Sequence, residues 1–170
     1  MIFRLSQKLA GKIKVAGLPE LPLADHPLTD WSAHLFVVAR TQYVIVSNTK
    51  SLYSTVIYGR GVNDHHSFIV EALRSIGDVL DNNGLSTVYQ QQIVAHTGSV
   101  RFAKALNRSV TGSMNELILL ARIILADGDI APCDVGRAVN GTLLSTLLGK
   151  DGKPYGKPRE AMRRLTDGER

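Results

Sequence analysis

The sequence has little cysteine, few aromatic residues and no long unbroken hydrophobic run. Cys133 is the single cysteine among 170 residues, so no disulfide can form within the chain. One thiol agrees with a reducing compartment, and the first residues lack the apolar block of a signal peptide, so we expect a cytoplasmic protein. Arg122 interrupts the longest apolar stretch, at 117–126, and no window reaches the ~18 apolar residues of a spanning helix. We therefore predict no membrane association.

Several compact motifs of enzymes are also missing. The chain contains no Gly-x-Ser-x-Gly, no phosphate-binding Gly-x-x-x-x-Gly-Lys-Ser/Thr, no Gly-x-Gly-x-x-Gly, and no cysteine and histidine cluster with zinc spacing. No reaction can be read from the sequence, and we expect no cofactor and no metal. These absences favour a binding or accessory protein over an enzyme.

The charge is placed unevenly. Hydrophobic residues make up 44% and charged residues 21%, the ordinary range of a globular chain. Residues 150–170 hold seven basic and four acidic side chains, so they supply +3 of the net charge of +5. We predict a single domain over 1–149 and a basic C-terminal tail over 150–170. The nearly neutral body argues against a nucleic-acid cradle on the domain itself.

The first part of the chain predicts a sheet. Segments rich in β-branched and aromatic residues predict strands at 31–40, 43–47 and 53–58. The connections at 41–42 and 48–51 are short enough to close hairpins, which favours antiparallel pairing. Two further short strands, at 2–5 and 100–106, are expected to extend this sheet.

Helical spacing dominates the later part. Apolar residues recur at helical intervals between Ile69 and Leu80, with Ser67 as the expected N-cap and Gly84 as the stop. The other predicted helices lie at 7–13, 87–96, 114–127, 133–148 and 160–165. Because the segment 114–127 is apolar almost all round, we predict that it is a central buried helix. The expected fold class is α+β, a small antiparallel sheet packed against a helical layer around that helix.

A polar stretch, NRSVTGSMNE at 107–116, comes before the predicted central helix. Ser113 and Glu116 have the spacing of a capping box, in which each side chain bonds the other residue's backbone amide. The residues ahead of the box have no such assignment. A guanidinium and a hydroxyl beside a helix N-terminus suit an anion or another polar ligand.

We therefore predict a polar or anion-binding site there. Its candidate residues are Asn107, Arg108, Ser109 and Asn115, joined by His34 and Arg40. In the competing interpretation, Arg108 is a buried side chain that satisfies loop carbonyl groups and holds its own segment in place.

Nucleic-acid binding is the second hypothesis. Lysine and arginine side chains of the tail can neutralise phosphates without reading sequence. These residues are Lys150, Lys153, Lys157, Arg159, Arg163 and Arg164. The competing interpretation is a solvated, partly disordered terminus. Trp31, Tyr43, Tyr53 and Tyr58 could form an aromatic platform, but strand alternation places these rings at least partly in the core.

A metal-dependent reaction is the third hypothesis. Asp64, His65 and His66 resemble the Asp-His-His signature of a phosphoesterase family that binds two metals. Such a site needs further Asp and His ligands to hold two cations about 3.5–4 Å apart, and no Asp-x-Asp pair stands on an upstream strand. Helix capping by Asp64 is the competing interpretation.

The order of these features resembles a family of uncharacterised, mostly bacterial proteins that share a domain of unknown function. The pattern of that family is Trp-x-Ala-x-Leu, an arginine hairpin, a strand that ends at Asn, a Tyr-containing strand, helices, and then Asn-Arg-Ser-Val-x-Gly-Ser-Met-Asn. In this chain the matching residues are Trp31, Ala33, Leu35, Arg40, Asn48, Tyr53 and the stretch 107–115. The resemblance covers most of residues 1–145. It implies a shared α+β fold and no particular activity.

Overall fold

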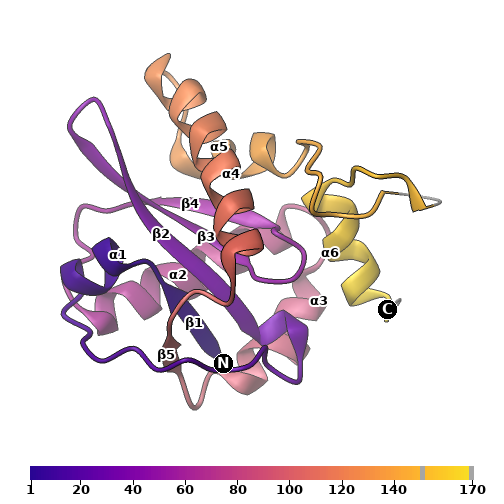
Figure 1. Cartoon of the computed structure of the whole chain (residues 1–170), viewed down its shortest axis with the longest axis horizontal. Helices are drawn as coiled ribbons and strands as arrows, with labels where there is room; N and C mark the ends of the chain where they lie inside the picture. Colours follow the sequence, from indigo (N-terminus) through magenta and orange to yellow (C-terminus); the bar gives the residue numbers. More distant parts are fainter. Residues whose placement is uncertain (150–151, 169–170) are drawn as a thin grey trace.

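A five-stranded mixed sheet forms the middle of the molecule (Figure 1). The computed structural model describes residues 1–149 and 152–168. In the spatial order β4-β3-β2-β1-β5, the strands are β4 (Ser54–Tyr58), β3 (Thr41–Asn48), β2 (Asp30–Val38), β1 (Ile2–Leu5) and β5 (Arg101–Ala103). The α+β class and the antiparallel pairing of β2, β3 and β4 are confirmed.

The sequence predicted an antiparallel sheet throughout, and for β1 this prediction is wrong. β1 runs parallel to both of its neighbours, β2 and β5. A parallel pair needs a crossover of about a dozen residues or more, and residues 6–29 supply one between β1 and β2. The length of this connection is a signal that the sequence analysis did not use.

Different helices cover the two faces of the sheet. The helical elements are α1 (Gln7–Lys12), η1 (Pro27–Thr29), α2 (His65–Asp81), α3 (Ser86–Val88), η2 (Tyr89–Ile93), η3 (Val94–His96), α4 (Arg108–Ala126), α5 (Pro132–Val139) and α6 (Pro158–Thr166). Phe3 and Trp31 pack with apolar residues of α1 and α2, whereas Ile45 and Val56 pack with those of α4 and α5. Figure 1 accordingly shows α2 behind the sheet and α4 in front of it.

Helix α4 begins six residues earlier than predicted. Asn107 is its N-cap, and the Asn107 Oδ1 accepts a hydrogen bond from the backbone amide of Val110 at 2.9 Å. Ser113 lies buried inside the helix, where its hydroxyl bonds the carbonyl of Ser109 and the hydroxyl of Thr146. The predicted capping box at Ser113 is therefore wrong. Asparagine caps a helix as well as serine does, so the earlier start was available to the chain.

Helix α4 is also not a central buried helix. Met114, Leu117 and Ala121 are fully buried against the sheet, but Leu119 is 62% exposed and Ile123 is 59% exposed on the outer face. Among the residues that the structure describes, α4 alone is long and apolar enough to cross a membrane by length and composition. Packed helices of soluble proteins pass the same test.

The chain after α4 departs from the predicted long helix at 133–148. Helix α5 stops at Val139, and Asn140 turns its side chain to the backbone of Ser54 on the outer edge of β4. Residues 140–149 then form turns, with one antiparallel bridge between Leu144 and Gly156. The helical spacing of residues 133–148 could not predict this end of the helix, because the bonds of Asn140 are to a strand that is distant in the sequence.

Residues 152–168 fold onto the body. Helix α6 buries Ala161 and Met162, and Met162 joins the core cluster that contains Trp31. The Ser51 hydroxyl also lies 3.5 Å from the Met162 sulfur. Over these residues, the segment that the sequence assigned to a basic tail therefore contributes to the hydrophobic core.

Candidate functional site

The β2–β3 hairpin ends in a turn that places an arginine at its tip. The turn residues are Ala39 and Arg40, both in the left-handed region with φ of 45° and 70°. Thr41 and Gln42, which the sequence predicted as the turn, are instead the first residues of β3. Turns with two left-handed residues match the natural twist of a hairpin, although glycine and asparagine are the usual occupants. Ala39 and Arg40 both carry a Cβ atom, so their left-handed conformation leaves backbone strain at this tip.

A second arginine comes from the end of the neighbouring strand. Gly59 follows β4 and donates a hydrogen bond to the carbonyl of Gln42 at 2.7 Å, with so little room that an added Cβ would lie 2.8 Å from the Gln42 Cβ. Arg60 is next, and Gly61 then turns the chain with φ of 87°. Glycine is favoured at such a position because it adopts positive φ without a steric penalty.

These two turns border an open pocket at the end of the β3–β4 pair. Its volume is about 640 Å³, and its lining residues are Arg40, Thr41, Gln42, Tyr58 and Arg60. This volume lies within the range of roughly 300–1,000 Å³ that small-ligand sites occupy. Over residues 1–149 and 152–168, neither guanidinium has an ion pair or a side-chain hydrogen bond. Two forks of hydrogen-bond donors therefore border the pocket with their charge uncompensated.

An aromatic row leads across the sheet to this pocket. Phe36 on β2 stacks on Tyr43 of β3 with ring centroids 5.7 Å apart, and Tyr43 lies 5.5 Å from Tyr58 on β4. Phe36 and Tyr43 are buried, while Tyr58 is 53% exposed. Because β4 is the edge strand, no further strand covers the side of Tyr58 that faces away from Tyr43. Trp31 and Tyr53, the other aromatics considered from sequence, are fully buried.

The predicted anion-site residues lie on three separate elements, with His34 on β2, Arg40 in the β2–β3 turn and the others at the N-cap of α4 or within it. Asn107 caps α4, Arg108 and Ser109 are exposed in its first turn, and Asn115 is exposed nearly two turns further on. His34 is nearly buried on the sheet, and burial lowers its pKa from the usual value. In Figure 1 the tip of the β2–β3 hairpin lies well away from the start of α4. Arg40 therefore belongs to a different site from Arg108.

The Asp64, His65 and His66 motif has a structural assignment. Asp64 is the N-cap of α2, and its carboxylate accepts a hydrogen bond from the amide of Ser67 at 2.8 Å. This bond is the main reason why the pKa of Asp64 is lowered. The two histidines are exposed in the first turn of α2. Among the residues that the structure describes, no group of three or more His, Cys, Asp or Glu side chains could hold a metal.

The basic residues of the C-terminal segment occupy the surface around α6. Lys153, Arg159 and Arg163 are exposed, while Lys157 and Arg164 are half-buried. Arg164 donates a hydrogen bond to the carbonyl of Leu148 at 2.6 Å. Lys150 lies outside the described residues. Tyr155 lies between Lys153 and Lys157 in the sequence and is 55% exposed. It was not among the residues that the sequence predicted for this surface.

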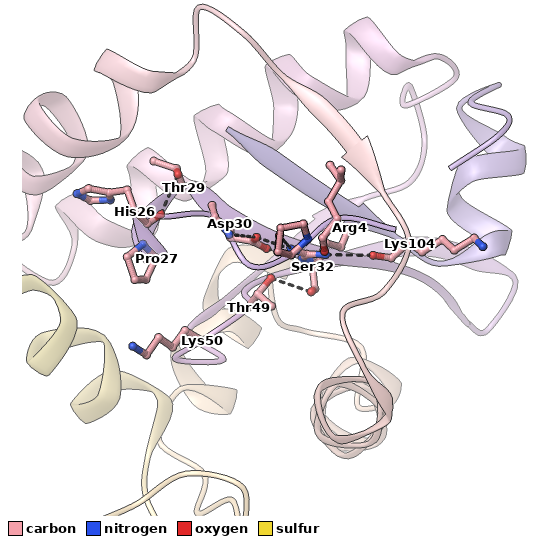
Figure 2. Close-up of polar contacts among 12 residues, drawn as sticks. Arg4, His26, Pro27, Thr29, Asp30, Ser32, Thr49, Lys50 and Lys104 are labelled. Atoms are coloured by element: carbon pink, nitrogen blue, oxygen red, sulfur yellow. Dashed lines mark hydrogen bonds and ion pairs between the residues drawn. The ribbon is translucent and has the colours of Figure 1, made fainter. Parts of the chain in front are cut away.

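The most buried charges belong to Arg4 and Asp30, a pair that sequence reasoning missed (Figure 2). Arg4 Nε and Nη2 donate to the two carboxylate oxygens at 2.8 and 2.7 Å. The remaining guanidinium hydrogens reach the carbonyls of Leu21, Pro22 and Lys104. Every donor of Arg4 thus has a partner within the chain, so this ion pair is a structural clamp on the proline-rich loop rather than a ligand site.

These observations define a small α+β domain with an arginine-lined pocket at one edge of its sheet. The chain belongs to the family described as Domain of unknown function (DUF6933), whose model matches residues 2–161. The match therefore extends into α6. No curated protein and no solved structure matches the chain.

Proposed function

We propose that the chain is a binding or accessory protein, and not an enzyme, that captures an anionic ligand between Arg40 and Arg60. The observation that carries this proposal is that Arg40 and Arg60, neither of which has an ion pair among the described residues, line the same pocket. Arginine presents a planar fork of donors that matches the oxygens of a carboxylate or a phosphate. The pocket has no cysteine, histidine or carboxylate side chain in its lining, so no base in the lining could activate the hydroxyl groups of Thr41 and Tyr58.

The test uses inorganic pyrophosphate as the probe in isothermal titration calorimetry at low salt. We expect binding to weaken roughly ten-fold or more in Arg40→Gln and in Arg60→Gln, because each loses charge-assisted hydrogen bonds. Arg122→Gln is the matched control, since Arg122 is another exposed arginine, on α4. Unchanged affinity in the Arg40→Gln, Arg60→Gln double variant, or no binding by the wild type, would reject the proposal.

A second candidate function is nucleic-acid binding by the surface around α6. Exposed Tyr155 supports it, because an aromatic ring between Lys153 and Lys157 combines stacking with phosphate neutralisation. Deletion of the segment is a poor test, since Met162 belongs to the core. We therefore expect the triple variant Lys153→Gln, Lys157→Gln, Arg163→Gln to bind a single-stranded oligonucleotide more weakly and with a smaller salt dependence. Equal salt slopes for variant and wild type would reject this function.

The same proposal includes a cytoplasmic location and a bacterial source. The single thiol, Cys133, supports the reducing compartment, and the likeness to mostly bacterial proteins supports the source.

The polar start of α4, with exposed Arg108 and Ser109, is proposed as an accessory anion contact separate from the pocket.

A further inference from the structure

Tyr58 gives the arginine pocket a flat apolar wall, and this wall limits the kind of anion that fits. The ring lines the same cavity as Arg40 and Arg60, and it is the exposed end of the Phe36, Tyr43 and Tyr58 row. A simple inorganic anion would use the two guanidinium groups and leave the ring in contact with water. A ligand with both a phosphate and a planar ring would use all three side chains.

One aromatic neighbour restrains the ring on the side that faces the sheet. Tyr58 and Tyr43 are cross-strand partners in the β3–β4 register, and their planes are inclined by only 31°. Tyr43 is held in turn by buried Phe36. Because this contact restrains the ring, less conformational entropy is lost when a second ring stacks on it, which favours binding.

We infer that the pocket binds a nucleotide unit, with the base stacked on Tyr58 and the phosphate held by Arg40 and Arg60. This inference rests on the proposed anion-binding function and names its ligand class. Aromatic stacking is tolerant of base identity, because every base presents a π-face. Thr41 and Gln42 add hydroxyl and amide groups to the lining, which can bond a ribose or the edge of a base.

The experiment compares adenosine 5′-monophosphate with ribose 5-phosphate, which carries the same phosphate without the base. We expect the nucleotide to bind roughly ten-fold more tightly, in line with the usual contribution of one stacked base. Tyr58→Leu should remove this preference, whereas Tyr58→Phe should keep it. Leu119→Ala serves as the control, because Leu119 is another exposed apolar side chain and lies on α4, away from the pocket lining.

A second readout separates stacking from a folding defect. The adenine H2 and H8 resonances should shift upfield in the presence of the wild type and of Tyr58→Phe, and not with Tyr58→Leu. Equal affinity for both phosphates, with continued dependence on Arg40 and Arg60, would overturn the nucleotide inference and leave the anion-binding function standing. Failure of both phosphates and of pyrophosphate to bind would overturn the proposed function itself.

The same chemistry occurs in a free nucleotide and in a nucleic-acid strand. A six-residue adenosine oligoribonucleotide distinguishes these sources. Affinity equal to that of the monophosphate supports a free nucleotide as the ligand. Tighter binding that still requires Tyr58 supports a strand, whereas oligomer binding that is insensitive to Tyr58→Leu would count against the pocket.

Discussion

Asn140 pairs with both backbone groups of Ser54, as though it were one residue of an additional strand. Its Oδ1 accepts from the Ser54 amide at 2.7 Å, and its Nδ2 donates to the Ser54 carbonyl at 2.8 Å. Ser54 begins the edge strand β4, whose outward-facing groups would otherwise lack partners in a buried position. Gly136 allows this approach, since an added Cβ there would lie 3.0 Å from the Ser54 oxygen.

We expect Asn140→Ala to destabilise the protein by roughly 2 kcal/mol or more, because two buried backbone groups lose their partners. Urea unfolding measures the change. Thr142→Ala, two residues further on, is the control and should lie within about 0.5 kcal/mol of the wild type. A similarly small effect of Asn140→Ala would show that water replaces the amide at this edge.

The buried ion pair should be far more sensitive than an exposed one. Arg4→Met leaves Asp30 charged and enclosed, so we expect a loss of about 3–5 kcal/mol in the free energy of unfolding. Arg74→Met removes the exposed pairs with Glu71 and Asp78 and should change it by less than about 1 kcal/mol. Equal losses in the two variants would contradict the structural role of the Arg4 clamp.

Two substitutions locate the start of α4. Asn107→Ala removes the side-chain cap and should lower stability by about 1 kcal/mol. Glu116→Ala changes an exposed residue well inside the helix and should be nearly neutral. Chemical denaturation of both variants decides the point, since a capping box at 113–116 requires the reverse order of effects.

His34 should make stability depend on pH on the acidic side of neutrality. Burial lowers its pKa in the folded state, whereas the unfolded chain titrates near 6.5. The unfolded state therefore takes up the proton first as the pH falls. The free energy of unfolding is therefore not reduced by His34 above about pH 6.5. Below that pH it falls progressively, until the pH reaches the lowered pKa of the folded state.

The measurement is urea unfolding of the wild type and of His34→Gln at pH 7.5, 6.0 and 5.0. Other titrating groups are shared, so the difference between the two proteins reports on His34. We expect the wild type to lose more stability than the variant on acidification. Parallel pH profiles would show that His34 is hydrated enough to titrate normally.

We expect Arg40 to favour anion binding while lowering the stability of the folded protein. Its φ of 70° is strained for an arginine, so Arg40→Gly relieves a penalty on the order of 1 kcal/mol, partly offset by the greater freedom of glycine in the unfolded chain. We expect a small rise in thermal stability together with weaker pyrophosphate binding. Arg40→Lys keeps the strain and should show no rise. An Arg40→Gly variant that is less stable than the wild type would contradict this account.

Local chemistry in the sequence determined most of the individual elements. β-Branched and aromatic runs specified β2, β3 and β4, and helical spacing specified α1, α2, α4 and α6, because these signals act over a few neighbouring residues. The short hairpin connections specified antiparallel pairing for the same reason. Asp64 also caps α2 locally, although the predicted N-cap was Ser67, which instead lies in the first turn and completes a capping box with Asp64.

Tertiary structure decided which residues meet. The side chain of Asn140, at the end of α5, bonds the backbone of Ser54. Arg4 bonds Asp30 and the proline-rich loop, and both sets of bonds join residues that are distant in the chain. Arg40 and Arg60 share a pocket only because β3 and β4 bring two separate turns to one edge of the sheet. Such contacts cannot be predicted from the spacing of residues in the sequence, because they arise from strand order and packing rather than from the preferences of adjacent residues.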